Sequence, residues 1–383
     1  MSTEGHLDYK IGIVGPTRVG KTSLIASILA DSQDLLAGTP IAMKPVGTPT
    51  ERRLALHRRE LQGSLLARKF SPGSLKGTEE PFTYRLRLDP DVPNLGIHLG
   101  FQDYPGGWLD PTQRPPGREK DWDECRAWLK DSSVLLVPID ATVLMEAAEE
   151  RHRRALPSIL TTIEVEEVAR TWAKSRTIRK LEPALMLLCP LKCETYFSDN
   201  GGGRDEADEL ADAVCEVYGD VLKAVHGECP DARILYAPVD TIGCVELIRV
   251  EWKEAPSAPS SYELQATYMV REPSRREVKG AGDVLVALCK HLAEARHVVE
   301  KETAEQKKSA AESAKEEAER REGFFKDIWI WLKGERAQRR KLADESRQDA
   351  DEVSKRVEAF GHVIQRLADK KYGPRVRDFS RGF

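Results

Sequence analysis

One short loop constrains this 383-residue chain more than any other feature. It reads Gly15-Pro16-Thr17-Arg18-Val19-Gly20-Lys21-Thr22, which fits the pattern GxxxxGK[ST], and Ser23 follows it. The glycines let the backbone bend so that successive N–H groups point at one anion. The pattern predicts that residues 15–23 bind the phosphates of a nucleoside triphosphate. We expect Lys21 to reach the β- and γ-phosphates and to serve catalysis, and the Thr22 hydroxyl to bind Mg²⁺.

The sequence on both sides of this loop fits a strand–loop–helix unit. The apolar run 10–14 predicts a buried strand, and 23–29 predicts a helix whose N-terminal dipole meets the phosphates. Further apolar runs alternate with helical patterns, with runs at 132–140, 183–190 and 232–239 and helical patterns at 142–155, 164–175 and 207–226. This alternation predicts an α/β fold of the P-loop NTPase class, with a mostly parallel sheet flanked by helices.

A second motif stands at the end of a predicted strand over residues 95–103. Asp103 begins an Asp-x-x-Gly sequence that ends at Gly106. A carboxylate at the C-terminal end of a strand can hold Mg²⁺, and the N–H of Gly106 can contact a γ-phosphate. The alternative is a plain Asp-Tyr-Pro-Gly turn without a ligand.

Between the two motifs lies a Gly- and Ser-rich loop that includes residues 71–78 and precedes a predicted strand over 81–88. A Thr in such a loop can bind Mg²⁺ through its hydroxyl and the γ-phosphate through its N–H, which orders the loop only in the triphosphate state. We assign this metal-binding and catalytic role to Thr78 and hold Thr83 in reserve. A surface threonine in a loop is the alternative for either residue.

The order of these motifs resembles that of the Ras-like, translation-factor-related GTPases. In that family a later strand ends in Asn/Thr-Lys-x-Asp, and this chain has Leu191-Lys192-Cys193-Glu194 at the corresponding place. The resemblance implies that Lys192 packs on guanine and Glu194 accepts hydrogen bonds from it, although Leu191 departs from the pattern. Pro238, in Ala237-Pro238-Val239, would then contact the base through its backbone. The implied ligands are GTP or GDP with Mg²⁺.

A narrower resemblance rests on the phrase Asp103-Tyr104-Pro105-Gly106-Gly107-Trp108-Leu109. It is similar to the DYPGxWL signature of the prokaryotic double-GTPases, which occur in pairs in bacterial conflict and signalling gene clusters. The resemblance covers roughly residues 8–296. It implies a bacterial GTPase that assembles with itself or with a second GTPase.

Ras-like enzymes orient the attacking water with a Gln directly after Asp-x-x-Gly, but this chain has Gly107 there, so hydrolysis must use another residue. Arg18 is the candidate replacement, since relatives of dynamin carry an arginine finger at this position of the loop. A guanidinium over the β,γ-bridge neutralises charge that grows in the transition state. The alternative is that Arg18 points to solvent or pairs with a partner, and that the chain is a GTP-loaded scaffold that barely hydrolyses.

Composition sets the remaining limits. Charged residues make up 32% of the chain but the net charge is only -4, which does not indicate specific nucleic-acid binding. The seven cysteines contain no CxxC pair, and the N-terminus has no apolar signal region, so we expect a cytoplasmic protein. Because the 191–194 element is imperfect, an ATP-using P-loop protein is a further hypothesis.

We divide the chain into a GTPase domain over residues 1–296 and a helical arm over 297–383. The domain carries a long second switch segment over 109–130 and a predicted β-hairpin over 244–272. In the switch segment, Arg114 and Arg118 are candidate γ-phosphate contacts, but a solvated basic loop is the favoured interpretation. The arm should contain a charged helix and a coiled-coil seam, which comprises Ala350, Val353, Val357, Phe360, Ile364 and Leu367. Its basic tail over 370–383 is expected to be mobile and to dock on an acidic partner.

The arm also contains the aromatic cluster, defined as Phe324 to Leu332 with Trp329 and Trp331. Packing against the GTPase domain or the second helix is one interpretation of this segment. A protein contact, with a partner or another copy, is the second interpretation. A membrane contact, as in a dynamin-like GTPase, ranks below it. No basic run flanks the cluster.

Overall fold

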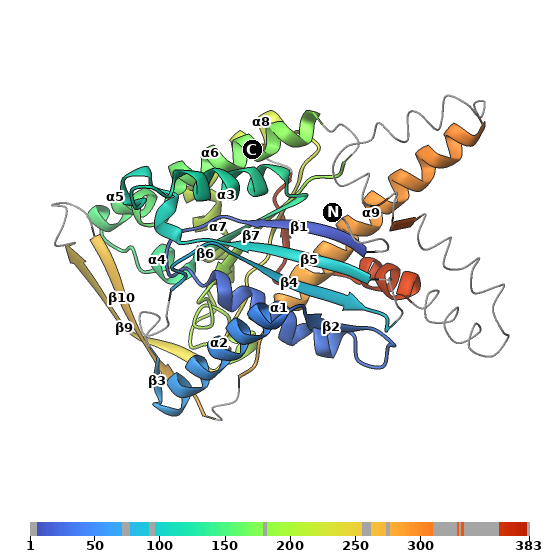
Figure 1. Cartoon of the computed structure of the whole chain (residues 1–383). Coiled ribbons are helices and arrows are strands. Elements are labelled where there is room, and N and C mark those ends of the chain that lie inside the picture. The colour runs from blue at the N-terminus through green and yellow to red at the C-terminus, as the bar shows by residue number, and fades with distance from the viewer. Residues whose placement is uncertain are drawn as a thin grey trace.

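The computed structural model describes residues 6–70, 77–91, 96–178, 182–254, 262–272, 276–308, 328, 331–332 and 360–380. Within these residues, an eight-stranded sheet runs through the centre in the order β11-β8-β7-β6-β1-β5-β4-β2 (Figure 1). Helices cover both faces of this sheet. The prediction of an α/β fold with a mostly parallel sheet is therefore confirmed.

The centre of the sheet is parallel, and its two edges are antiparallel. The parallel strands are β1 (His6–Ile13), β5 (Gly96–Asp103), β6 (Val134–Asp140), β7 (Leu185–Leu191) and β8 (Arg233–Tyr236). The antiparallel strands are β4 (Phe82–Asp89), β2 (Ala42–Pro45) and β11 (Arg377–Asp378). Parallel strands covered on both faces need apolar residues at successive positions. In β6, Leu136 lies in the core on one face and Leu135 in the core on the other.

Two groups of helices form the outer layers. Figure 1 shows α3, α6 and α8 on one side of the sheet and α1 and α2 on the other. The first side holds α3 (Glu119–Asp131), α6 (Thr162–Ile178), α7 (Ala207–Val217) and α8 (Gly219–Glu228). The second side holds α1 (Lys21–Leu35), α2 (Thr48–Leu66) and α9 (Ala281–Lys308).

The predicted helices over 142–155 and 207–226 are each broken in two. The first becomes α4 (Ala141–Met145) and α5 (Glu150–Ile159), and the second becomes α7 and α8. Asp140 caps α4 by accepting hydrogen bonds from the backbone N–H groups of Thr142 and Val143. The continuous helical pattern in the sequence hides these breaks.

A small second sheet comes from the predicted hairpin. It contains β3 (Lys69–Phe70), β10 (Tyr262–Val270) and β9 (Val245–Glu254), in that order. One face of β10 buries Ala266, Tyr268 and Val270 against Leu61 and Leu65 of α2. The hairpin prediction is confirmed, while its connecting loop over 255–260 lies outside the described residues.

The described part of the arm shares the core of the main sheet. Ile328, Trp331 and Leu332 are buried in the same cluster as α1 and α9, as the packing interpretation expects for these residues. The ring of Trp331 meets Phe360 edge-on at 6.3 Å, and residues 360–369 form a helix. The rest of the aromatic cluster, including Trp329, and the seam residues before Phe360 lie outside the described residues.

The described part of the basic tail, residues 370–380, packs against the main sheet, which contradicts the prediction of a mobile tail. Arg377 and Asp378 form β11, which pairs with Tyr236 and Leu235 of β8. Phe379 donates its N–H to the Ile234 carbonyl at 2.8 Å and is buried. The sequence shows only a run of basic residues, because the strand edge that binds the tail comes from residues far away in the chain.

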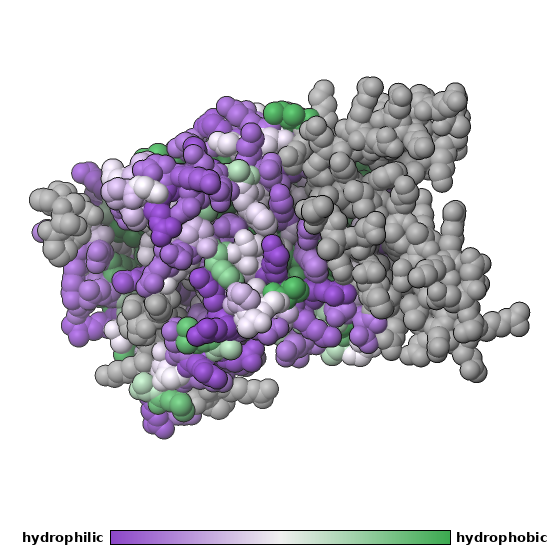
Figure 2. Space-filling view, in the orientation of Figure 1, coloured by the Kyte–Doolittle hydropathy of each residue, from purple (hydrophilic) through white to green (hydrophobic). Residues whose placement is uncertain are grey.

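The surface shown in Figure 2 is mostly hydrophilic, with single apolar residues scattered over it. None of the helices in the described part of the chain combines the length and the apolar character that crossing a membrane requires.

Candidate functional site

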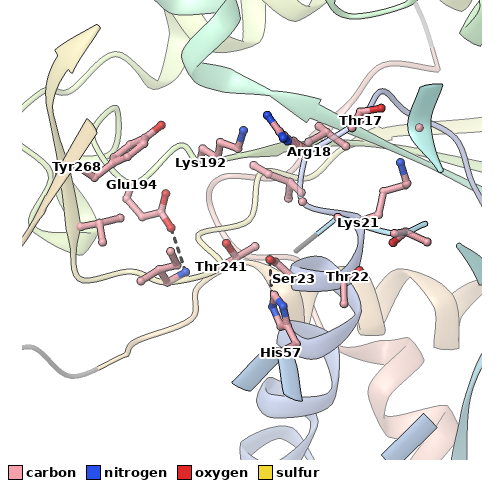
Figure 3. Close-up of a pocket in the computed structure, with 18 of the residues that line it drawn as sticks. Thr17, Arg18, Lys21, Thr22, Ser23, His57, Lys192, Glu194, Thr241 and Tyr268 are labelled. Atoms are coloured by element: carbon pink, nitrogen blue, oxygen red, sulfur yellow. Dashed lines mark hydrogen bonds between the residues drawn. The ribbon is translucent and has the colours of Figure 1, made fainter. Parts of the chain in front are cut away.

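One pocket collects most of the predicted residues (Figure 3). It is lined by residues 17–23, by Thr78 and Gly106, and by Lys192 and Glu194. With residues 241–242 and Tyr268 included, six segments that are far apart in the sequence meet here. The pocket lies where β1, β5 and β7 end, as expected for a ligand site in a parallel α/β sheet.

The 15–23 loop joins β1 to α1 in a tight bend. Gly20 is the residue before α1 and has φ +113°, a conformation that favours glycine, and Arg18 has φ +61°. Lys21 turns back and donates hydrogen bonds to the carbonyls of Gly15 and Pro16, each at 3.0 Å. Burial lowers the pKa of Lys21, while the Asp103 carboxylate opposes that shift. The loop thus holds a buried ammonium group at the N-terminus of a helix, a favourable place for an anion.

Three predicted metal-binding residues meet at Asp103. Its Oδ2 accepts hydrogen bonds from the hydroxyls of Thr22, at 3.1 Å, and of Thr78, at 2.7 Å. Asp103 is fully buried, and among the described residues its Oδ1 has no hydrogen-bond partner. A buried carboxylate flanked by two hydroxyls is the oxygen donor set that Mg²⁺ prefers. Thr83 instead donates to Gln102 at 2.6 Å, so the structure favours Thr78 over the reserve.

Gly106 lies directly against the 15–23 loop. A Cβ atom on Gly106 would stand 2.2 Å from the backbone nitrogen of Thr17, so no larger residue fits. A Cβ on the next residue, Gly107, would meet the side-chain oxygen of Gln113 at 3.0 Å. Gln113 belongs to a short 3-10 helix, η3 (Pro111–Gln113), in the long second switch segment. Gly107 takes the place of the glutamine of Ras-like enzymes, but the side chain of Gln113 lies beside it in the fold.

The basic residues of that segment do not serve the pocket. Arg114 donates to the Leu109 carbonyl at 3.1 Å and lies over the Trp122 ring at 4.6 Å. Arg118 pairs with Asp121 at 2.7 Å and with Glu80 at 3.1 Å. Both side chains fix the local loop. Arg18, in contrast, is exposed and lines the pocket, and no hydrogen bond or ion pair engages it within the described residues.

Lys192 and Glu194 enter the other end of the pocket from the loop after β7 (Figure 3). Lys192 has φ +59° and its Nζ pairs with the Asp140 carboxylate. Glu194 is buried, and its Oε1 accepts hydrogen bonds from the N–H groups of Ile242, at 3.0 Å, and Gly243, at 3.3 Å. Burial raises the pKa of Glu194 to about 7, and the nearby Asp240 adds to the shift.

The loop after β8 lines the pocket with residues that follow Pro238 in the chain. Pro238 is not among the residues that line the pocket, and Thr241 and Ile242 line it instead. The chain stays extended beside β7 beyond the end of β8, because the Val239 N–H bonds to the Pro190 carbonyl at 2.8 Å. The loop that faces the pocket therefore begins later than the apolar run in the sequence indicates.

Two further lining residues carry no signal in the sequence. Tyr268 of β10 is buried and bonds to the Thr142 hydroxyl, so the second sheet closes the end of the pocket that holds Glu194 (Figure 3). His57 of α2 bonds to the Ser23 hydroxyl at 3.2 Å. Burial lowers the pKa of His57 to about 4, which keeps it neutral. The sequence pattern predicts the strand that carries Tyr268, but it does not predict that the side chains of Tyr268 and His57 face the pocket.

Comparison with known proteins assigns neither a family nor a function to this chain. No protein-family model matches the chain, and no curated protein is similar to it in sequence.

Proposed function

We propose that this protein is a GTP-binding and GTP-hydrolysing molecular switch. One observation carries the proposal. Thr22 and Thr78 both bond to the buried Asp103, beside the ammonium group of Lys21, and Glu194 lines the same pocket. The residues proposed to bind phosphate, metal and base thus lie one after another along a single pocket, as a bound nucleotide would require. This arrangement supports the P-loop and Ras-like interpretation of the sequence.

At the phosphate end, each residue has a definite task. The backbone N–H groups of residues 15–23 and the ammonium of Lys21 would bind the β- and γ-phosphates. Thr22, Thr78 and Asp103 would hold Mg²⁺, which when bound neutralises negative charge between those phosphates. Because Thr78 and Gly106 come from two separate loops that rest on this end, loss of the γ-phosphate would release both.

At the other end, Lys192 would pack its stem on the guanine ring. The carboxylate of Glu194 would accept hydrogen bonds from the ring N–H and the amino group. Tyr268 closes this end of the pocket. Adenine lacks this pair of donors, so the carboxylate would select guanine over adenine.

Turnover should be slow in the isolated chain and faster on assembly with a second copy or a partner GTPase. Gly107 has no side chain to orient water, and the exposed Arg18 has room to move over a bound γ-phosphate. The similarity of the 103–109 phrase supports a place in a bacterial conflict or signalling system.

The test is nucleotide turnover, with GTP beside ATP, over a range of protein concentrations and with or without Mg²⁺. We expect GTP-selective, Mg²⁺-dependent hydrolysis whose specific rate rises with protein concentration. Equal hydrolysis of GTP and ATP would overturn the proposal that the pocket selects guanine over adenine.

A second candidate is a GTP-loaded scaffold that barely hydrolyses. The absence of a side chain at Gly107 favours it. Tight GTP binding with negligible turnover at every protein concentration would support the scaffold and count against the switch.

A further inference from the structure

The C-terminal tail lies directly behind the end of the pocket that holds Glu194. Arg375 is 6% exposed and donates from Nη1 to Asp240 at 2.8 Å and from Nε to Asp199 at 2.9 Å. Its guanidinium also stacks on the ring of Phe197 at 4.0 Å. Asp199 and Phe197 belong to the loop after β7, and Asp240 belongs to the loop after β8. One side chain from the end of the chain therefore joins both base-side loops.

Asp240 is the buried centre of this contact. Besides Arg375, it accepts hydrogen bonds from the amide of Asn200, at 2.8 Å, and from the Cys193 thiol, at 3.2 Å. Asp240 is fully buried. A buried carboxylate that loses its paired cation is strongly destabilised, because the remaining charge has no solvent to stabilise it. Arg375 is thus the cation that pairs with Asp240 and holds it in place.

Both loops lead straight to Glu194. Cys193, which bonds to Asp240, directly precedes Glu194, and the amides of Ile242 and Gly243 that hold Glu194 Oε1 follow Asp240 closely. The position of the Glu194 carboxylate therefore depends on how the two loops meet. The Asp240 charge also repels that of Glu194, and Arg375 offsets this repulsion.

We propose that Arg375 is a positioning residue for base recognition, which makes the C-terminal tail a structural part of the guanine site. This inference rests on the proposed function. Arg375 does not touch the base. It holds the two loops so that Glu194 faces the pocket as a carboxylate.

The tail is firmly attached on both sides of Arg375. Gly373 donates its N–H to Asp283 at 2.8 Å, and β11 pairs with β8 just beyond. The helix over 360–369 leads directly into this segment. The tail is therefore held against the domain on both sides of Arg375.

The test compares Arg375→Ala and Arg375→Lys with the matched control Arg377→Ala in the full-length protein. Arg377 lies in the same tail but pairs with the exposed Asp208. Dissociation constants are measured for GDP and ADP. We expect Arg375→Ala to weaken GDP binding by about tenfold or more while ADP binding changes little. Arg377→Ala should leave both constants within about twofold.

Arg375→Lys should recover only part of the GDP affinity, because an ammonium group keeps the charge but cannot bond to both carboxylates in a fork. Asp199→Asn is a milder variant that loosens Arg375 without leaving Asp240 unpaired. Thermal unfolding shows which variants fold. If Arg375→Ala fails to fold, Asp199→Asn tests the proposal, with an expected loss of GDP affinity of about threefold.

A pH profile separates positioning from a general structural role. Loss of the Arg375 charge leaves Asp240 unopposed, so the midpoint of the GDP affinity profile should move to higher pH in Arg375→Ala. Titratable or charged side chains near Glu194 also contribute to this midpoint, namely Asp240, Lys192, Cys193, Cys244, Tyr268 and Arg276. Arg377→Ala should keep the wild-type midpoint.

Each outcome is decisive. If the wild-type protein does not prefer GDP to ADP, the base assignment in the proposed function fails, and this inference falls with it. If the wild type prefers GDP and folded Arg375→Ala or Asp199→Asn keeps the full preference, only the inference about the tail is overturned.

Discussion

The two ends of the pocket, here named the phosphate end and the base end after the functions proposed for them, are built in different ways. The phosphate end uses residues 15–23 together with Thr78 and Asp103, which belong to short motifs that the sequence displays. The base end joins Glu194 to the loop after β8, to Tyr268 of the second sheet and, behind them, to Arg375 of the tail. Under the proposed function, phosphate binding would rest on short motifs that the sequence displays, whereas base binding would depend on contacts between distant segments.

The largest expected effect concerns catalysis at the phosphate end. If Arg18 acts as an arginine finger, Arg18→Ala should lower turnover on the order of 10³-fold at high protein concentration. GTP affinity should change by less than about threefold, because Arg18 is exposed and engages no other described residue. Single-turnover hydrolysis and a binding titration measure the two quantities. An unchanged rate would favour the scaffold. Gln113→Ala shows whether the glutamine beside Gly107 contributes.

Lys21→Ala should weaken binding of GTP and ATP by the same factor, on the order of 10², because in the proposed function the ammonium group would contact the phosphates and not the base. Isothermal titration with both nucleotides measures the ratio. Glu194→Gln is the companion variant at the base end, and it should weaken GTP alone. If Lys21→Ala changed the preference between GTP and ATP, the idea that separate ends of the pocket bind phosphate and select the base would be contradicted.

Thr78 and Thr83 offer a matched pair of threonines. Thr78→Ala should lower Mg²⁺-dependent turnover by about thirtyfold, since its hydroxyl lies 2.7 Å from Asp103. Thr83→Ala should have little effect, because that hydroxyl bonds to Gln102. Steady-state rates over a Mg²⁺ titration compare them. Equal losses in the two variants would remove Thr78 from the metal site.

The smallest expected effect is the pH dependence of guanine binding. Burial raises the pKa of Glu194 to about 7, so the carboxylate proposed to accept hydrogen bonds from guanine is lost as the pH falls through that value. GDP affinity should therefore be greatest above pH 8 and fall by about tenfold by pH 6. ADP affinity and the Glu194→Gln variant serve as controls, and both should lack this step. A flat GDP profile in the wild type would contradict the role of Glu194.

Much of the fold was predictable because its signals are local. Continuous apolar runs marked the buried parallel strands, and alternation marked the hairpin of the second sheet. The breaks between α4 and α5 and between α7 and α8 were not predictable from periodicity, because the same apolar spacing runs across them. The sequence predicts a mobile tail because no local pattern reveals that Arg375 has two carboxylate partners elsewhere.

The sequence by itself determined the phosphate end: a bent glycine loop, a lysine and hydroxyl groups can bind an anion wherever they stand before a helix. Only the tertiary structure decided that Thr78 and not Thr83 bonds to Asp103, and that Thr241 and Ile242 replace Pro238 at the pocket. It alone brought Tyr268 and Arg375 to the base end. The physical reason is that neighbouring residues share one backbone geometry, whereas residues hundreds of positions apart meet only through the packing of the sheet and its helices.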